Sequence, residues 1–310
     1  MNEPQAIEDS FWLDADQDKR GSEGLCAALQ ARAQNGVSMR GFQLKYAALA
    51  DIDLVNHNQR EGYDLRGADL YRADLQNAHL FALDLRGSSL MKADLRGANL
   101  HCCDLRGCNL LGVQLNGARL DNVIWDRRLP QERQGRVLQR NGDIAAAHRY
   151  YQEAEETYRN LRLHLEKAGL FEQAGVFFHR EMVMRRWQLP RYSGRRLLSW
   201  LVDLFSGYGE KPLNVVLFSI MLICACGLLY FIVGVHHGDL ALGLALERGW
   251  LANLDDLIDC LYFSVVTFTT LGYGDITPHG LARPIAAFEA FAGSFTMALF
   301  VVVFVKKMTR

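Results

Sequence analysis

Residues 64–90 read DLRGA DLYRA DLQNA HLFAL DLRGS SL, a stretch in which a leucine returns at every fifth position. The leucines keep this spacing to Leu120, and a shorter run at Leu44, Leu49 and Leu54 precedes them, displaced by one residue across 56–62. Two places before each leucine the residue is usually small, as at Ala68. A period of five matches neither the 3.6 of a helix nor the 2 of a strand. The chain must therefore turn once in every repeat.

If each repeat forms one side of a square coil, the leucine and the small residue both point inward, and four repeats close a turn of twenty. That longer period is visible, because DLRG begins at Asp64, Asp84 and Asp104, although it also recurs out of phase at Asp94. Over roughly 41–126 the chain resembles the pentapeptide-repeat family. The resemblance implies a right-handed quadrilateral β-helix whose coils stack at about 4.8 Å.

The charge of the repeat region limits what it binds. Residues 41–126 hold nine Lys or Arg against eleven Asp or Glu. This balance argues against mimicry of nucleic acid and against a nucleic-acid binder. We expect a rigid spacer or assembly platform, with an unknown cytoplasmic ligand or protein partner at the repeat domain as the alternative.

The segment before the repeats, 1–40, is expected to be an N-terminal cap or a disordered segment. Its acidic, polar start has no secretory signal, so we expect it to stay in the cytosol. The seven cysteines are odd in number and lack metal-ligand spacing, which favours reduced thiols over disulfides.

After the repeats, 127–191 is predicted to be a helical hairpin connector. Its first helix has one stripe, which is Tyr150, Ala154, Tyr158, Leu161 and Leu165. The second helix, 171–187, is expected to bury Ala174, Phe177, Phe178 and Met182. The remaining residues, 192–310, begin with a basic amphipathic stretch at 195–206, predicted to be a slide helix in the cytoplasmic headgroup layer of membrane lipid.

Two apolar segments are long enough to cross a membrane. The outer helix, 213–235, has no charge, and the inner helix, 283–305, has Glu289 within its apolar part. Basic residues lie before the first span and after the second, at Lys306, Lys307 and Arg310, whereas acidic residues, including Asp239, lie between them. The positive-inside rule then predicts a multi-pass protein of the plasma membrane, a bacterial inner membrane, with both termini cytoplasmic.

A pore helix and filter are predicted at 254–275, which contains TTLGYGD at 269–275 after an apolar stretch. This resembles the potassium-channel signature TVGYGD, with Leu271 in place of valine. The resemblance implies K+ bound in the filter by the carbonyls of Thr270, Leu271, Gly272 and Tyr273, with Gly272 and Gly274 supplying permissive backbone angles. Tyr273 is expected to pack behind the filter. Each chain supplies one quarter of each ring, so a homotetramer is implied, with no organic cofactor.

Further residues are assigned to filter support and gating. Val266 stands where some two-span channels place Glu, which leaves Tyr262 as the partner of Asp275. Glu289 is costly in lipid, so we expect it to form hydrogen bonds near the pore helix. Gly293 is read as a gating hinge or as a close helix contact. Phe300 and Phe304 are candidates for an inner gate.

The sequence predicts an all-α, two-span, tetrameric potassium channel pore regulated by a cytoplasmic repeat domain. Two alternatives stay open: a weakly selective cation channel, and a membrane-tethered scaffold with a vestigial pore. No catalytic constellation is visible, so the chain is not expected to be an enzyme.

Overall fold

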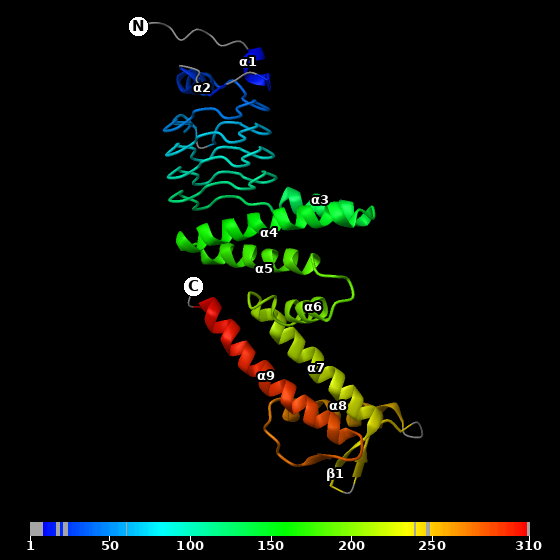
Figure 1. Ribbon diagram of the computed structural model, residues 1–310. Coiled ribbons are helices and arrows are strands. Elements are labelled where there is room, and N and C mark those ends of the chain that lie inside the picture. Colours follow the sequence, from blue (N-terminus) through cyan, green and yellow to red (C-terminus); the bar gives the residue numbers. More distant parts are fainter. Residues whose placement is uncertain are drawn as a thin grey trace. The chain divides into compact units, whose positions relative to one another are not determined.

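The computed structural model describes residues 9–16, 19–20, 24–59, 61–238, 240–245 and 249–308. Asp239, Arg310 and much of the predicted segment 1–40 lie outside these residues. The chain divides into two compact units, Met1–Arg196 and Leu197–Arg310. In the first, a stack of coils stands between two short helices and a group of longer ones (Figure 1).

The coils repeat every twenty residues. Parallel bridges pair Asp64 with Asp84, and the next three repeats bridge in the same way, so each coil has one bridge per repeat. In the first coil the partners are 26 positions apart, as in Gln43 and Asp69 (69 − 43 = 26), because the stretch 56–62 interrupts the five-residue spacing of the sequence. The predicted twenty-residue turn is confirmed.

The coil interior is filled by the leucines and the small residues. The leucines at every fifth position from Leu65 to Leu120 are at most 3% exposed, and Leu83 and Val113, which stand where the small residue is usual, are also buried. Three small positions carry hydrogen-bond donors. Ser88 Oγ donates to the Leu65 carbonyl at 2.9 Å, Cys103 Sγ to the Leu80 carbonyl at 2.7 Å, and Cys108 Sγ to the Leu85 carbonyl at 2.9 Å. Burial raises the pKa of both thiols to about 12, so they stay protonated and can donate.

All seven cysteines are free in the structure.

Both ends of the coil stack are covered. Helix α1 (Asp9–Leu13) places Trp12 on Phe42, with ring centroids 5.1 Å apart and planes 12° apart, and α2 (Leu25–Gln34) buries its apolar face. The described part of 1–40 therefore contains two short helices. At the other end Gln131 Nε2 donates to Asn109 Oδ1 at 2.6 Å. These contacts shield the end coils from pairing with other chains.

The connector has three helices where a hairpin was predicted. Helix α3 (Pro130–Arg140) precedes α4 (Ile144–Lys167) and α5 (Phe171–Trp187). Four residues of the predicted stripe of α4 are buried, but Tyr151 lies inside in place of Tyr150.

On α5 the predicted core residues are only half correct. Ala174 and Phe177 are buried, whereas Phe178 and Met182 are half-buried. The inner face continues instead through Glu181 and Met184. A buried carboxylate is tolerated at 181 because Arg159 and Arg162 pair with it, at 3.2 and 2.9 Å.

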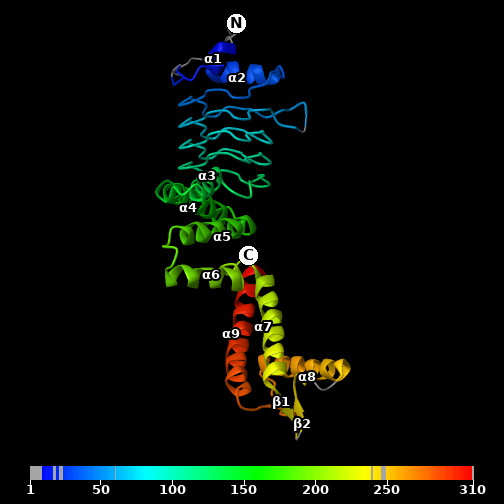
Figure 2. The same cartoon turned by 90° about the vertical axis from the view of Figure 1, so that its right-hand side faces the viewer.

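The second unit begins at Leu197, inside α6 (Gly194–Ser206), and contains two long helices that run side by side, α7 (Pro212–Val233) and α9 (Ala282–Met308) (Figure 2). Both are long and apolar enough to cross a membrane. Helix α8 (Trp250–Phe268) packs against both of them. It approaches α7 closely at Gly227, where an added Cβ would lie 2.6 Å from Leu261 Cδ2.

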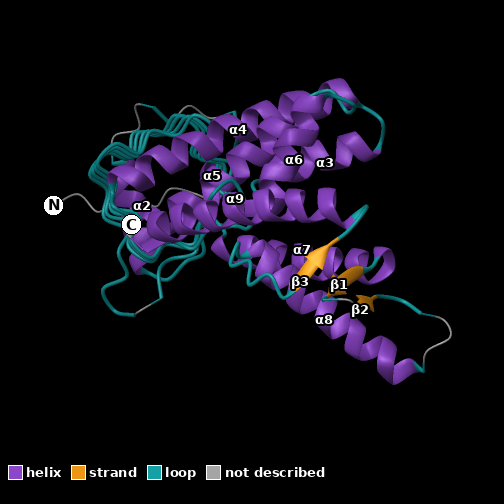
Figure 3. Cartoon of the chain, turned by 90° about the horizontal axis from the view of Figure 1, so that it is seen from below, coloured by secondary structure: helices purple, strands orange, loops and turns teal. Residues whose placement is uncertain are grey.

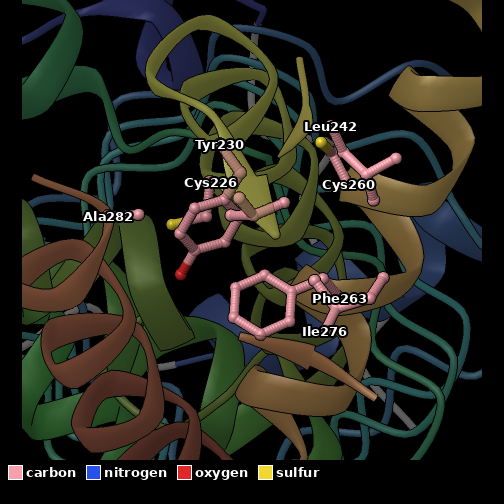
Figure 4. Packing of buried hydrophobic residues seen from close by; sticks show 8 residues of the cluster. Cys226, Tyr230, Leu242, Cys260, Phe263, Ile276 and Ala282 are labelled. Atoms are coloured by element: carbon pink, nitrogen blue, oxygen red, sulfur yellow. The ribbon is translucent and has the colours of Figure 1, made fainter. Parts of the chain in front are cut away.

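A small antiparallel sheet adjoins these helices, in the order β2–β1–β3 (Figure 3). Its strands are β1 (Val235–His237), β2 (Leu240–Leu242) and β3 (Ile276–Pro278). A shared apolar cluster joins the sheet to the three helices, with Tyr230, Phe263 and Ile276 among its buried members (Figure 4).

The predicted bounds of the helices in this unit need small corrections. The outer helix ends at Val233 instead of 235 because Gly234 takes φ +91° and β1 begins at the next residue. The pore helix starts at Trp250, four residues before the predicted 254. The inner helix extends to Met308, beyond the predicted 305.

Candidate functional site

The carboxyl end of α8 leads directly into the predicted filter. The helix ends at Phe268, and the N–H groups of Thr270 and Leu271 donate to the carbonyls of Thr267 and Val266 at 3.0 and 3.1 Å. The carboxyl end of a helix carries about half a negative charge. The start of segment 269–275 therefore lies in a field that favours cations.

The backbone of this segment alternates between two conformations. Thr270, Gly272 and Gly274 have φ of +58°, +59° and +81°, whereas Leu271 and Tyr273 do not have positive φ. In such an alternation the N–H groups converge on one side of the chain, which leaves carbonyls for the other side. Thr270 is strained here, because the left-handed region costs a residue with a side chain about 1–2 kcal/mol. Gly272 and Gly274 adopt this region without such strain, and the direction of the carbonyls stays a prediction.

The side chains of this segment are open in a single chain. Leu271 is 60% and Tyr273 is 68% exposed. A single chain does not test the packing of Tyr273 behind the filter, which stays a prediction.

Tyr262 and Asp275 are brought together as the sequence predicted. Tyr262 Oη donates to Asp275 Oδ2 at 3.0 Å. Loss of water raises the pKa of Asp275, but this hydrogen bond and those from nearby backbone N–H groups outweigh it, and the pKa lies below its usual value. Val266 is buried, and its carbonyl accepts the N–H of Leu271. A supporting role for the three residues stays a prediction.

Replacing Tyr262 by phenylalanine is expected to shorten the time over which reconstituted protein sustains potassium flux, because Asp275 loses its side-chain donor. A time course of flux measures this. Because the pKa of Asp275 is lowered in the folded state, the contact is fully present above the ordinary carboxyl pKa and is lost as external pH falls through the lower value. An identical time course for the variant and the parent would contradict the role.

Glu289 is buried at the meeting point of three helices. It is fully buried on α9, accepts a hydrogen bond from Tyr230 Oη of α7 at 2.6 Å, and accepts another from Ser264 Oγ of α8. The predicted hydrogen bonding near the pore helix is confirmed. Tyr230 and Ser264 were not singled out from the sequence, because a lone polar residue in an apolar helix does not show which residue it contacts.

Gly293 lies against the carboxyl end of α8. A Cβ at this position would lie 2.1 Å from the Phe268 carbonyl oxygen. The close-packing interpretation is thus confirmed, and the hinge stays a prediction. Farther along α9, Phe300 and Phe304 stack with centroids 5.6 Å apart, and Phe304 is 44% exposed.

An ion pair joins the carboxyl end of α9 to the segment just before α7. Lys306 Nζ lies 2.6 Å from Glu210 Oε1, so the last turn of α9 is tied to the residues before α7. The sequence offered no sign of this contact, since the partners are 96 positions apart.

No group of three or more His, Cys, Asp or Glu able to hold a metal ion occurs among the residues that the structure describes.

Comparisons with known proteins identify two parts of the chain. An ion channel family matches residues 217–310, and pentapeptide repeats match in eight copies at 64–97 and 88–124. No curated protein matches the sequence.

Among solved structures, the pentapeptide repeat protein Rfr23 of the cyanobacterium Cyanothece 51142 is 28% identical over 26% of this chain, with a TM-score of 0.14. HetL, a pentapeptide repeat protein involved in heterocyst differentiation regulation in Nostoc sp. strain PCC 7120, is 31% identical over 29% of this chain, with a TM-score of 0.17. The chain spans 62% and 47% of the length of these two proteins.

Proposed function

We propose that this chain, a membrane protein with pentapeptide repeats and a carboxyl-terminal ion channel domain, forms a potassium-selective pore as a homotetramer. The observation that carries the proposal is the alternating backbone of Thr270 to Gly274 at the carboxyl end of α8, between two helices able to span a membrane. Passive conduction of K+ follows from this arrangement.

Carbonyl oxygens supply the chemistry. A potassium ion that enters a narrow pore loses its water, and stacked rings of carbonyls replace that shell. One chain offers a single carbonyl to each ring, so four copies around an axis complete it. The exposure of Leu271 and Tyr273 supports this assembly, because neighbouring subunits would cover them.

Helix α6 and the basic residues at its start support placement in a membrane. Leu197, Leu198 and Trp200 are 59%, 62% and 49% exposed, directly after Arg195 and Arg196. A helix with exposed apolar residues beside basic ones lies in the headgroup layer of a membrane. This supports a plasma membrane protein, in a bacterial inner membrane, with both termini in the cytoplasm.

The test is ion flux through purified full-length protein in liposomes. The proposal expects a reversal potential that follows the potassium gradient and a tetramer by native mass spectrometry. Equal responses to sodium and potassium would favour a weakly selective cation channel. A tetramer or monomer that conducts no better than empty lipid would favour the scaffold with a vestigial pore.

Regulation by the repeat domain is a separate part of the proposal. Removing residues 1–126 deletes the coils and leaves α3 to α9 in place. We expect the open probability in planar bilayers to change, because the coils are attached through the connector to the segment before α7. Unchanged gating in the truncated channel would contradict this part and leave the pore proposal standing.

The ion pair between Glu210 and Lys306 is expected to hold the inner helix end in its resting position. Glu210→Lys and Lys306→Glu, each alone, should shift open probability in the same direction because each places like charges together. The double exchange should restore the parent value. Single-channel recordings of the three variants measure this, and a double variant that behaves as the sum of the singles would rule out the coupling.

A further inference from the structure

One face of the small sheet brings two histidines together. His236 lies on β1 opposite Thr277 of β3, and His279 follows β3 directly. Residues opposite each other and two positions further along lie on the same face of an antiparallel pair. The two imidazole rings are in contact, with centroids 4.4 Å apart and planes at 61°. His237, the next residue of β1, pairs with Ile276 and points to the opposite face.

One ring nitrogen of His236 lacks a hydrogen-bond partner among the described residues. Its Nδ1 atom is buried and has no hydrogen-bond partner in the part of the chain that the structure describes. Buried polar atoms are nearly always paired, so each exception needs an explanation. Beside it, the Nε2 atom of His279 lies 3.4 Å from the Thr277 hydroxyl. This face of the sheet therefore carries imidazole nitrogens whose hydrogen-bonding capacity is not filled by the described protein groups.

We propose that His236 and His279 are the two protein ligands of a transition-metal ion of the zinc class. Zinc binds imidazole nitrogen at about 2.0–2.1 Å, which puts the ring centroids of two ligands of one tetrahedral ion about 5 Å apart. The observed 4.4 Å reaches this value by small rotations of the rings. Water completes the coordination, since no third ligand of the usual types lies close enough among the described residues.

The donor set determines which ions bind. Two neutral imidazoles suit Zn2+, Cu2+ or Ni2+, whereas Mg2+ and Ca2+ prefer oxygen ligands. The site is thus chemically separate from the carbonyl oxygens of the filter segment. It is also close to that segment, because β3 starts at the residue after Asp275 and β1 starts two residues after α7 ends. A bound ion would link the end of α7 to the strand that leaves the filter.

The experiment is an isothermal titration calorimetry measurement in which ZnCl2 is added to purified, tag-free, full-length protein. The parent protein should show one zinc-binding site, and His236→Gln and His279→Gln should each lower the zinc affinity of that site by at least about 10- to 100-fold. His237→Gln is the matched control, since it removes a histidine from the same strand but the opposite face, and it should bind as the parent does. MgCl2 should show no such binding.

Equal zinc binding by the parent and both variants would overturn the site, as would an equal loss in His237→Gln. The His279 side chain is exposed, so its replacement leaves the packed core intact and keeps the test valid if the His236 variant unfolds. The histidines outside 236, 237 and 279 are present in every variant, so any zinc binding by them is the same in all of the proteins compared. Binding is read without ion flux, so a channel that proves unselective for potassium does not affect the result.

Discussion

Gly272→Ala is expected to lower potassium flux through the reconstituted protein by at least about tenfold. Gly272 has φ of +59°, where a residue with a side chain costs about 1–2 kcal/mol. Four subunits contribute this cost to one filter, and about 1.4 kcal/mol already changes a population tenfold. The filter then leaves the conformation in which its carbonyls face one side. Flux into liposomes at equal protein content measures the loss.

Gly280→Ala is the control for this substitution. Gly280 also has a left-handed backbone, at φ +52°, and a Cβ there meets no atom within 4 Å, as at Gly272. It differs in lying beyond β3, outside the segment 270–274. The local strain is therefore matched, and flux should remain close to that of the parent. Equal loss in both variants would assign the effect to general instability, and unchanged flux in Gly272→Ala would remove the central support of the proposed function.

Gly293→Ala is expected to destabilise the folded protein, with a lower thermal midpoint. Alanine in a helix interior normally stabilises relative to glycine, by about 0.8–1.0 kcal/mol. Here its Cβ would lie 2.1 Å from the Phe268 carbonyl oxygen, and backbone atoms of α8 cannot move aside as a flexible side chain does. Forced overpacking costs about 1–3 kcal/mol, so the sign of the helix preference is reversed.

The sign of the change separates two roles of Gly293. If Gly293 served only as a hinge, alanine would raise the thermal midpoint and alter gating without disturbing the packing of α8. If it serves as a contact, alanine lowers the midpoint and displaces the carboxyl end of α8 from its place before Thr269. Gly249→Ala, at the N-cap of α8 with no atom within 4 Å of an added Cβ, provides the control and should lower the midpoint less, because it loses only the N-cap preference for glycine over alanine. A raised midpoint for Gly293→Ala would contradict the contact.

The correct sequence predictions concern local periods and local backbone needs. The leucine spacing predicted the coil of twenty because each repeat of five contains its own turn and its own inward residues. Glycines at 272 and 274 were predicted to permit special backbone angles for the same kind of reason, and both adopt left-handed backbone, which few other residues adopt cheaply. Long apolar runs likewise predicted α7 and α9 within a few residues.

The wrong predictions concern which way a helix faces. Tyr151 was passed over for Tyr150, and Phe178 and Met182 were expected inside α5. Two adjacent aromatic residues satisfy a helical stripe almost equally well, so the period alone does not choose between them. Helix α3 was missed because its apolar content is low and its buried Glu132 is stabilised by Arg136 at 2.9 Å and by the Tyr158 hydroxyl at 2.7 Å.

The amino-acid sequence by itself determined the order of the parts: coil, helical connector, two apolar helices and a glycine-containing filter segment between them. Each depends on residues within a few positions of one another. The tertiary structure alone decided the contacts between distant residues, such as Tyr230 with Glu289, Glu210 with Lys306 and His236 with His279. Such contacts depend on how whole helices and strands pack, and packing is a property of shapes that meet in space, which no spacing along the chain encodes.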